Sequence, residues 1–247
     1  MADPRILTDD GSPTLWSETY QEHYHSTSGA WLEARERFVV PCRVVDRARR
    51  LGQVRILDVG FGLGWNLLWA CLAVREACPG ARVHAVSMER DLVPSETLRS
   101  LYSVVPDPQV AEWFAELVRT GEVDNPSVTL QLLRGAAELE IRRVSGDFDC
   151  VFLDPFSPSK NPELWEAGFL REVRERARPA AILSTYSAAV RVKIALLAAG
   201  WSIGQGPRVG AKSSGTLATN GPVDPPIQPL PARELRRLLK RTNEVAP

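Results

Sequence analysis

One carboxylate stands out because it directly follows an apolar run. Residues 148–153 read Phe-Asp-Cys-Val-Phe-Leu, a pattern typical of a buried strand, and Asp154 comes next. Pro155 and Pro158 restrict the backbone on both sides of Phe156, so the carboxylate and the aromatic ring are held in a fixed geometry. An acceptor beside an aromatic ring suits an amine or a base nucleophile, which Asp154 could orient by hydrogen bonding. The simpler alternative is an Asp-Pro pair that only ends a strand.

Three glycines after another apolar run form a second candidate ligand site. Residues 54–59 predict a buried strand, and Gly60, Gly62 and Gly64 follow it in a G-x-G-x-G pattern. Glycine lets the backbone turn sharply and approach a ligand closely. Residues 66–76 then predict a helix whose free N–H groups face that ligand. The spacing differs from the dinucleotide pattern G-x-G-x-x-G, which favours S-adenosylmethionine over NAD. A tight turn without a ligand is the alternative.

Glu89 ends the next predicted strand, residues 82–89, and lies 25 positions beyond Gly64. An acidic residue in this place after a glycine loop can accept hydrogen bonds from a ribose diol. The two oxygens of a carboxylate match the two hydroxyl donors of the diol. The alternative is a surface glutamate that pairs with Arg90.

The rest of the chain alternates between strand and helix patterns. Further strands are predicted at 127–133, 148–154 and 180–185, a closing hairpin at 201–204 and 215–219, and helices at 92–104, 109–120, 136–144, 162–177 and 188–199. Such alternation indicates an α/β fold with a mostly parallel sheet and helices on both faces. Because ligands of such folds bind outside the carboxyl ends of the strands, the two candidate sites should share one crevice.

Three segments are expected along the chain. Residues 1–50 form an N-terminal cap, residues 51–221 the Rossmann-like domain, and residues 222–247 a proline-rich linker followed by a basic helix. In that last helix Leu235, Leu238 and Leu239 are expected to face inward. A basic helix of this kind is more often a solvated surface than a phosphate contact.

Composition excludes several classes of protein. The 30 basic and 30 acidic side chains of the 247 residues cancel, so the whole chain carries no field that would attract nucleic acid. No apolar run approaches the length that spans a bilayer, and the acidic N-terminus lacks the apolar core of a signal peptide, so a cytoplasmic protein is expected. The four cysteines are scattered, which favours reduced thiols over disulfides or a metal site.

The segments from Asp154 to Trp165 and from Gly60 to Asn66 resemble those of the MnmC-type methyltransferases, which make 5-methylaminomethyl-2-thiouridine at the tRNA wobble position. The block from Asp154 to Trp165 looks like the family signature D-x-F-x-P-x-K-N-P-x-x-W, and the loop from Gly60 to Asn66 is similar to G-F-G-T-G-x-N. Tyr24-His-Ser-Thr-Ser-Gly-Ala30 with Glu33 resembles an N-terminal motif of the family, and Gly210-Ala-Lys212 with Gly215-Thr216 resembles a later one. Some bacteria fuse this domain to a flavin-dependent oxidase; this chain resembles the stand-alone methyltransferases.

The resemblance implies a Rossmann-like, class I S-adenosylmethionine-dependent methyltransferase fold with a mostly parallel seven-stranded sheet, and it implies a set of site residues. Asp154 would orient and deprotonate the aminomethyl nitrogen of a wobble uridine in the tRNA anticodon stem-loop, and a separate enzyme could supply that aminomethyl precursor. The cofactor S-adenosyl-L-methionine would be held by Gly60, Gly62, Gly64, Asn66, Glu89 and Glu138. The substrate would contact Tyr24, Glu33, Phe156, Lys160, Tyr186 and Lys212, and no metal is expected.

The sequence departs from the family pattern at three places. Leu63 stands where threonine is common, and Pro155 where glycine or alanine is usual. Arg134-Gly-Ala136 stands where relatives often place an acidic residue near the adenine, a contact that Glu138 could replace. A small-molecule amine methyltransferase, an aminopropyltransferase and a non-catalytic RNA-binding module stay open as alternatives.

Overall fold

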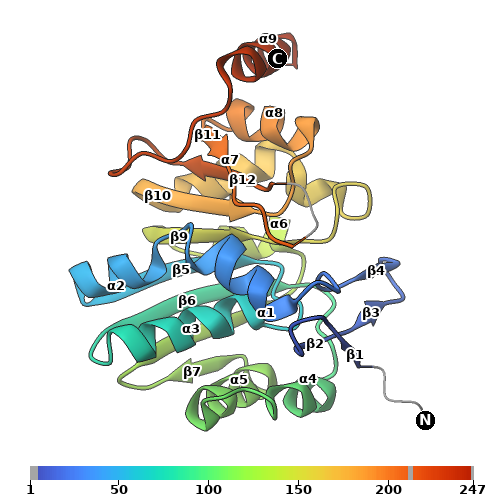
Figure 1. Cartoon of the computed structure of the whole chain (residues 1–247), viewed down its shortest axis with the longest axis vertical. Helices are drawn as coiled ribbons and strands as arrows, with labels where there is room; N and C mark the ends of the chain where they lie inside the picture. The colour runs from blue at the N-terminus through green and yellow to red at the C-terminus, as the bar shows by residue number, and fades with distance from the viewer. Residues whose placement is uncertain (1–4, 211–213, 246–247) are drawn as a thin grey trace.

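The computed structural model describes residues 5–210 and 214–245 of the chain. Within these residues the main sheet has eight strands in the order β11-β12-β10-β9-β5-β6-β8-β7. Figure 1 shows them stacked from β11 and β12 above to β7 below. The strands are β5 (Gln53–Val59), β6 (Arg82–Glu89), β7 (Glu122–Asp124), β8 (Val128–Arg134), β9 (Phe148–Leu153), β10 (Ala177–Thr185), β11 (Ser202–Gln205) and β12 (Thr216–Thr219).

The pairing matches the predicted parallel sheet with a closing hairpin. Strand β5 pairs in parallel with β6 and β9, β6 with β8, and β9 with β10. Strands β11 and β12 form the expected antiparallel hairpin, which joins the sheet at β10. The eighth strand, β7, was not predicted: it has three residues, too few for a recognisable pattern, and pairs antiparallel with β8.

Helices cover both faces of the sheet. The helical segments are α1 (Ala30–Glu33), the π-helical η1 (Ala34–Val39), α2 (Val44–Leu51), α3 (Trp65–Ala77), α4 (Ser95–Tyr102), α5 (Pro108–Thr120), α6 (Ala137–Glu140), the 3₁₀ turns η2 (Ile141–Arg143) and η3 (Pro162–Trp165), α7 (Ala167–Glu175), α8 (Val190–Ala198) and α9 (Ala232–Val245). Two apolar cores result, because alternate residues of β5 point to opposite faces: Ile56 joins the core under α1 to α5, and Leu57 the core under α6 to α9.

The helix predicted at 92–104 is only α4, Ser95–Tyr102, and two further predicted helices are interrupted or shortened. The helix predicted at 136–144 is only the single turn of α6 followed by η2. The helix predicted at 162–177 is divided into η3 and α7, because Glu166 has an extended backbone, and the next strand already begins at Ala177. Both segments lie beside the carboxyl edge of the sheet, where irregular backbone surrounds the site described below.

The N-terminal segment folds over that carboxyl edge. It consists of two hairpins, β1 (Ile6–Leu7) with β2 (Pro13–Thr14) and β3 (Trp16–Ser17) with β4 (Glu22–His23), followed by α1 and η1 (Figure 1). Segments on both sides of the predicted boundaries at residues 50 and 221 pack together: η1 contacts α3, and α9 contacts α8. The boundaries stay a prediction.

Candidate active site

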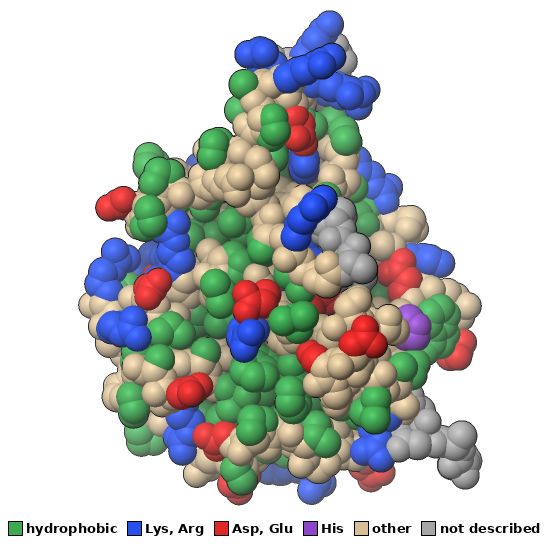
Figure 2. Space-filling view, in the orientation of Figure 1, with side chains coloured by type: hydrophobic (Ala, Val, Ile, Leu, Met, Phe, Trp, Pro, Cys, Tyr) green, Lys and Arg blue, Asp and Glu red, His purple; other side chains and the backbone are tan. Residues whose placement is uncertain are grey.

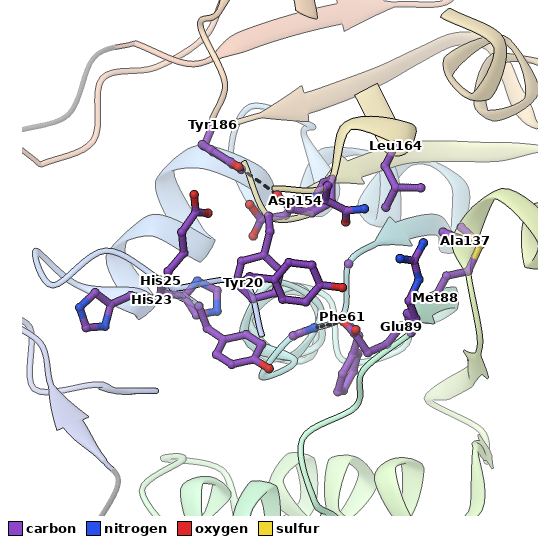
Figure 3. Close-up of a pocket in the computed structure, with 18 of the residues that line it drawn as sticks. Tyr20, His23, His25, Phe61, Met88, Glu89, Ala137, Asp154, Leu164 and Tyr186 are labelled. Carbon is purple, nitrogen blue, oxygen red and sulfur yellow. Dashed lines mark hydrogen bonds between the residues drawn. The ribbon is translucent and has the colours of Figure 1, made fainter. Parts of the chain in front are cut away.

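A pocket opens at the carboxyl ends of β5, β6 and β9 (Figure 3). It holds about 890 Å³ of space, its open mouth included. The glycine loop, the end of β6 and the loop after β9 form its floor and two of its walls, and the β3–β4 hairpin closes a third side. The lining side chains used below are Tyr20, Glu22, Tyr24, Glu33, Glu89, Arg90, Asp154, Phe156 and Tyr186.

The glycine loop fits closely between its neighbours. Gly60 has a φ of +89°, and a Cβ on it would lie 2.8 Å from the carbonyl oxygen of Asp154. Gly62 has a φ of +55°, and its Cβ would lie 3.2 Å from the Tyr24 ring. Both positions therefore require glycine. Gly64 does not line the pocket; with a φ of +81° it begins α3.

Glu89 is anchored by the backbone around it. Gly62 N donates to Glu89 Oε2 at 2.9 Å, and Asp91 N donates to Oε1 at 2.9 Å. Burial raises the pKa of Glu89, while these backbone hydrogen bonds oppose that shift. Glu89 lines the pocket, and its carboxylate has about four acceptor positions, so these backbone contacts leave acceptor capacity for a ligand. The geometry fits a ligand with a vicinal diol, as the ribose of S-adenosylmethionine has.

Asp154 faces the same pocket from the end of β9. The Asn66 side chain donates from Nδ2 to Asp154 Oδ2 at 2.6 Å, which fixes the carboxylate above the start of α3. Burial and the nearby charge of Glu33 raise the pKa of Asp154 well above its usual range, and the hydrogen bond from Asn66 acts in the opposite direction. Asn66, predicted to hold the cofactor, does not line the pocket itself; its Oδ1 is buried and has no hydrogen-bond partner among the described residues.

A buried ion pair supports the wall beside Asp154. Glu33 Oε1 lies 3.3 Å from Arg37 Nε, and Glu33 Oε2 accepts a hydrogen bond from Ser26 N at 3.1 Å. Arg37 is fully buried, whereas Glu33 reaches the pocket. The sequence analysis did not identify Arg37 as a site residue, although the i, i+4 spacing of a Glu and an Arg is a recognisable signal.

Asp58, the residue before Val59 in β5, is also buried, and burial raises its pKa to about 7.

Aromatic rings form the opposite wall. The Tyr20 and Phe156 rings stack with centroids 4.0 Å apart and planes 13° apart, and Tyr24 meets Phe156 edge-on at 5.1 Å. Tyr20 Oη donates to Asp91 Oδ2 at 2.7 Å, and Tyr186 Oη donates to the Pro155 carbonyl at 2.9 Å. One face of Phe156, predicted as a stacking surface for substrate, is therefore already covered by Tyr20, which sequence reasoning missed.

The Tyr20 contacts give a prediction for the mobility of the β3–β4 hairpin. Tyr20→Phe removes the hydrogen bond to Asp91, which is worth about 0.5–1.5 kcal/mol. Local opening of residues 16–24 should then rise roughly 2–10-fold, measured by amide hydrogen exchange. Tyr20→Leu also removes the stacking and should raise exchange further. Unchanged exchange in both variants would show that other contacts hold the hairpin down.

The remaining predicted site residues lie elsewhere. Glu138 does not line the pocket; it pairs with Arg90 at 3.1 Å, and Arg90 also contacts Glu163 at 2.7 Å. Lys160 is exposed in the loop after β9. Lys212 lies outside the described residues. Near the predicted adenine position the pocket is instead lined by Met88, Ala137 and Leu164, apolar residues without a spacing that would identify them.

Comparison with known proteins identifies the family. Residues 104–221 match a family described as S-adenosyl-L-methionine-dependent methyltransferase. The crystal structure of MnmC2 from Aquifex aeolicus aligns with a TM-score of 0.82 and 35% identity, over 96% of this chain and 76% of that one. The bifunctional protein MnmC of Pseudomonas fluorescens is 33% identical over 221 residues, and that of Aromatoleum aromaticum 35% over 220. Each of these two alignments covers 83% of this chain.

The chain spans about a third of the length of these bifunctional relatives, 32% and 34%. The predicted fold, the S-adenosylmethionine-dependent class and the resemblance to MnmC are confirmed. In the described residues no helix is long and apolar enough to cross a membrane. The chain belongs to the MnmC-type family of S-adenosylmethionine-dependent methyltransferases.

Proposed function

We propose that this chain methylates the primary amine of 5-aminomethyl-(2-thio)uridine at the tRNA wobble position, giving the 5-methylaminomethyl nucleoside. The bifunctional relatives named for 5-methylaminomethyl-2-thiouridine biosynthesis support the choice of substrate. The observation that carries the proposal is the placement of Asp154, a carboxylate with a raised pKa, in one pocket with the glycine loop and Glu89.

The pocket residues fit the cofactor through separate contacts. Glu89 would hold the ribose hydroxyls, Gly60 and Gly62 would let the backbone approach closely, and Asn66 would act from behind the pocket wall by fixing the Asp154 carboxylate. When bound, S-adenosylmethionine supplies an activated methyl group. Since the methyl group is already activated, the protein has to position the amine, exclude water and accept one proton.

Asp154 is the proton acceptor in this proposal. An alkylammonium has no free lone pair, so the substrate nitrogen must lose a proton before it can attack. Asp154 would accept a hydrogen bond from that nitrogen and take the proton onto its carboxylate. Because burial and Glu33 raise its pKa, the Asp154 carboxylate is a stronger base than an exposed aspartate.

The aromatic wall suits an extruded nucleobase. Tyr24, Phe156 and Tyr186 present ring surfaces or edges to the pocket, and proteins that read unstacked bases commonly place them on aromatic side chains. The partner proposed is the anticodon stem-loop of tRNA, with a separate enzyme supplying the aminomethyl group. A tRNA substrate also implies that the protein works in the cytoplasm.

The direct test is methylation of defined substrates. Purified protein with S-adenosylmethionine should convert aminomethyl-uridine in tRNA to the methylaminomethyl form, detected by mass spectrometry of digested nucleosides. The free nucleoside and simple alkylamines at equal concentration should react far more slowly. Fast methylation of the small amines with no reaction on tRNA would favour a small-molecule amine methyltransferase instead.

Two lysines are predicted to contact tRNA phosphates. Reversing Lys160 and Lys212 to Glu should weaken tRNA binding and reduce the slope of log affinity against log salt by about 1 for each lost contact. Affinity for S-adenosylhomocysteine, measured by calorimetry, should stay unchanged. If tRNA affinity is also unchanged, both lysines are ordinary surface residues.

A further inference from the structure

Helix α9 stands at one end of the molecule's longest axis (Figure 1). It packs against α8 through its apolar side, where Leu238 is 2% exposed and Leu235 is half-buried. An ion pair of 2.7 Å between Lys193 Nζ on α8 and Glu234 Oε1 adds to this attachment. The helix is therefore held in a fixed orientation on the body of the protein. Leu239, predicted to face inward, is 44% exposed.

The outer side of α9 is strongly basic. At 100° per residue, five cationic side chains fall on one face, opposite Leu235 and Leu238. All five are exposed, and Figure 2 shows Lys and Arg side chains gathered at this end of the molecule. We call this surface the α9 cationic face, which consists of Arg233, Arg236, Arg237, Lys240 and Arg241.

The pocket has the opposite charge. Its lining includes the carboxylates of Glu22, Glu33, Glu89 and Asp154, and Arg90 is the one Arg or Lys among its described residues. Arg90 is itself paired with two glutamates. Such a lining suits a cationic amine but repels a polyanionic backbone. Backbone phosphates of a bound RNA would then be held by cations outside this lining.

We propose that the α9 cationic face binds backbone phosphates of tRNA, in a part of the tRNA away from the wobble nucleotide. The inference rests on the proposed function for its partner. Arginine forms bidentate hydrogen bonds with phosphate, and four of the five cations are arginines. An anionic membrane fits less well, because a surface-bound helix inserts its apolar side, and here Leu235 and Leu238 pack on α8.

The test reverses three charges at the centre of this face in the full chain. The variant Arg233→Glu, Arg237→Glu, Lys240→Glu should bind tRNA at least 10-fold more weakly near 0.1 M salt, and the slope of log affinity against log salt should fall by about 2–3. A matched control reverses Arg50, Arg99 and Arg119, exposed residues on α2, α4 and α5, with the same change in net charge. The control should keep tRNA affinity within about 2-fold.

The outcomes separate this inference from the proposed function. Equal loss of affinity in the α9 variant and the control, or no loss in either, would overturn the inference. Stronger binding of the parental chain to phosphatidylserine vesicles than to tRNA would also overturn it. If the α9 variant alone loses tRNA binding while the parental protein methylates no tRNA, the cationic face stands and the proposed function fails. Calorimetry with S-adenosylhomocysteine should give parental affinity in both variants, which shows that each is folded.

Discussion

Replacing Asp154 with asparagine is expected to slow methyl transfer by about 10²–10⁴-fold, the range for one positioned acid or base. The amide keeps the shape of the carboxylate, so Asn66 can still contact it and the loop should stay in place. What is lost is the group that takes a proton from the substrate amine. Affinities for cofactor and tRNA should change little, which single-turnover kinetics and separate binding measurements will distinguish.

The pH profile makes the role of Asp154 testable in more detail. Its raised pKa means that the basic form of the parental enzyme becomes populated only as pH rises through that pKa, so the rate should rise over the same range. In the asparagine variant the loss should shrink at high pH, since free amine becomes abundant without help. Asp46→Asn, at an exposed position on α2, is the matched control. An Asp154 variant with the parental rate near neutral pH would remove this residue from the mechanism.

Replacing Glu89 with alanine is expected to weaken binding of S-adenosylmethionine by about 1–3 kcal/mol, roughly 5–150-fold. The substitution removes the acceptor for the ribose and also leaves the amides of Gly62 and Asp91 without their partner. Glu89→Gln keeps one acceptor oxygen and should lose less.

Calorimetry with S-adenosylhomocysteine measures this difference directly. Glu96→Ala, at an exposed position in the first turn of α4, serves as the control and should bind normally. Parental affinity in the Glu89→Ala variant would show that the ribose lies elsewhere.

The sequence predicts those parts of the fold and site that depend on single elements. Apolar runs mark the parallel strands, and the carboxyl ends of parallel strands lie at one edge of the sheet. The sequence alone therefore predicts that Asp154, Glu89 and the glycine loop share one pocket, as the structure has them. The three-residue strand β7 and the short α6 escaped because local patterns fix neither their length nor their ends.

Residues that depend on long-range folding could not be placed from sequence. Tyr20 covers Phe156 only because the β3–β4 hairpin folds back over the sheet, and no periodicity reports such a contact. Arg37 is fully buried because it lies in the π-helical segment η1, where it pairs with Glu33 four residues earlier. Glu138, predicted to hold the cofactor, instead pairs with Arg90, which also pairs with Glu163. This arrangement too depends on contacts between segments far apart in the sequence.

The segments that form the walls of the pocket lie far apart in the sequence, so the ribosome makes them at different times. The Tyr20 hydroxyl reaches Asp91, 71 residues later, and Glu22 accepts hydrogen bonds from Ser157, 135 residues later. On the ribosome the N-terminal hairpins therefore emerge well before the strands against which they pack. Apolar residues such as Leu15, buried in the folded protein, stay exposed to solvent until then. Contacts of such long separation slow folding. Residues 5–30 should be the last to acquire protection from amide exchange during refolding, and the nascent chain should depend on chaperones until β9 has been made.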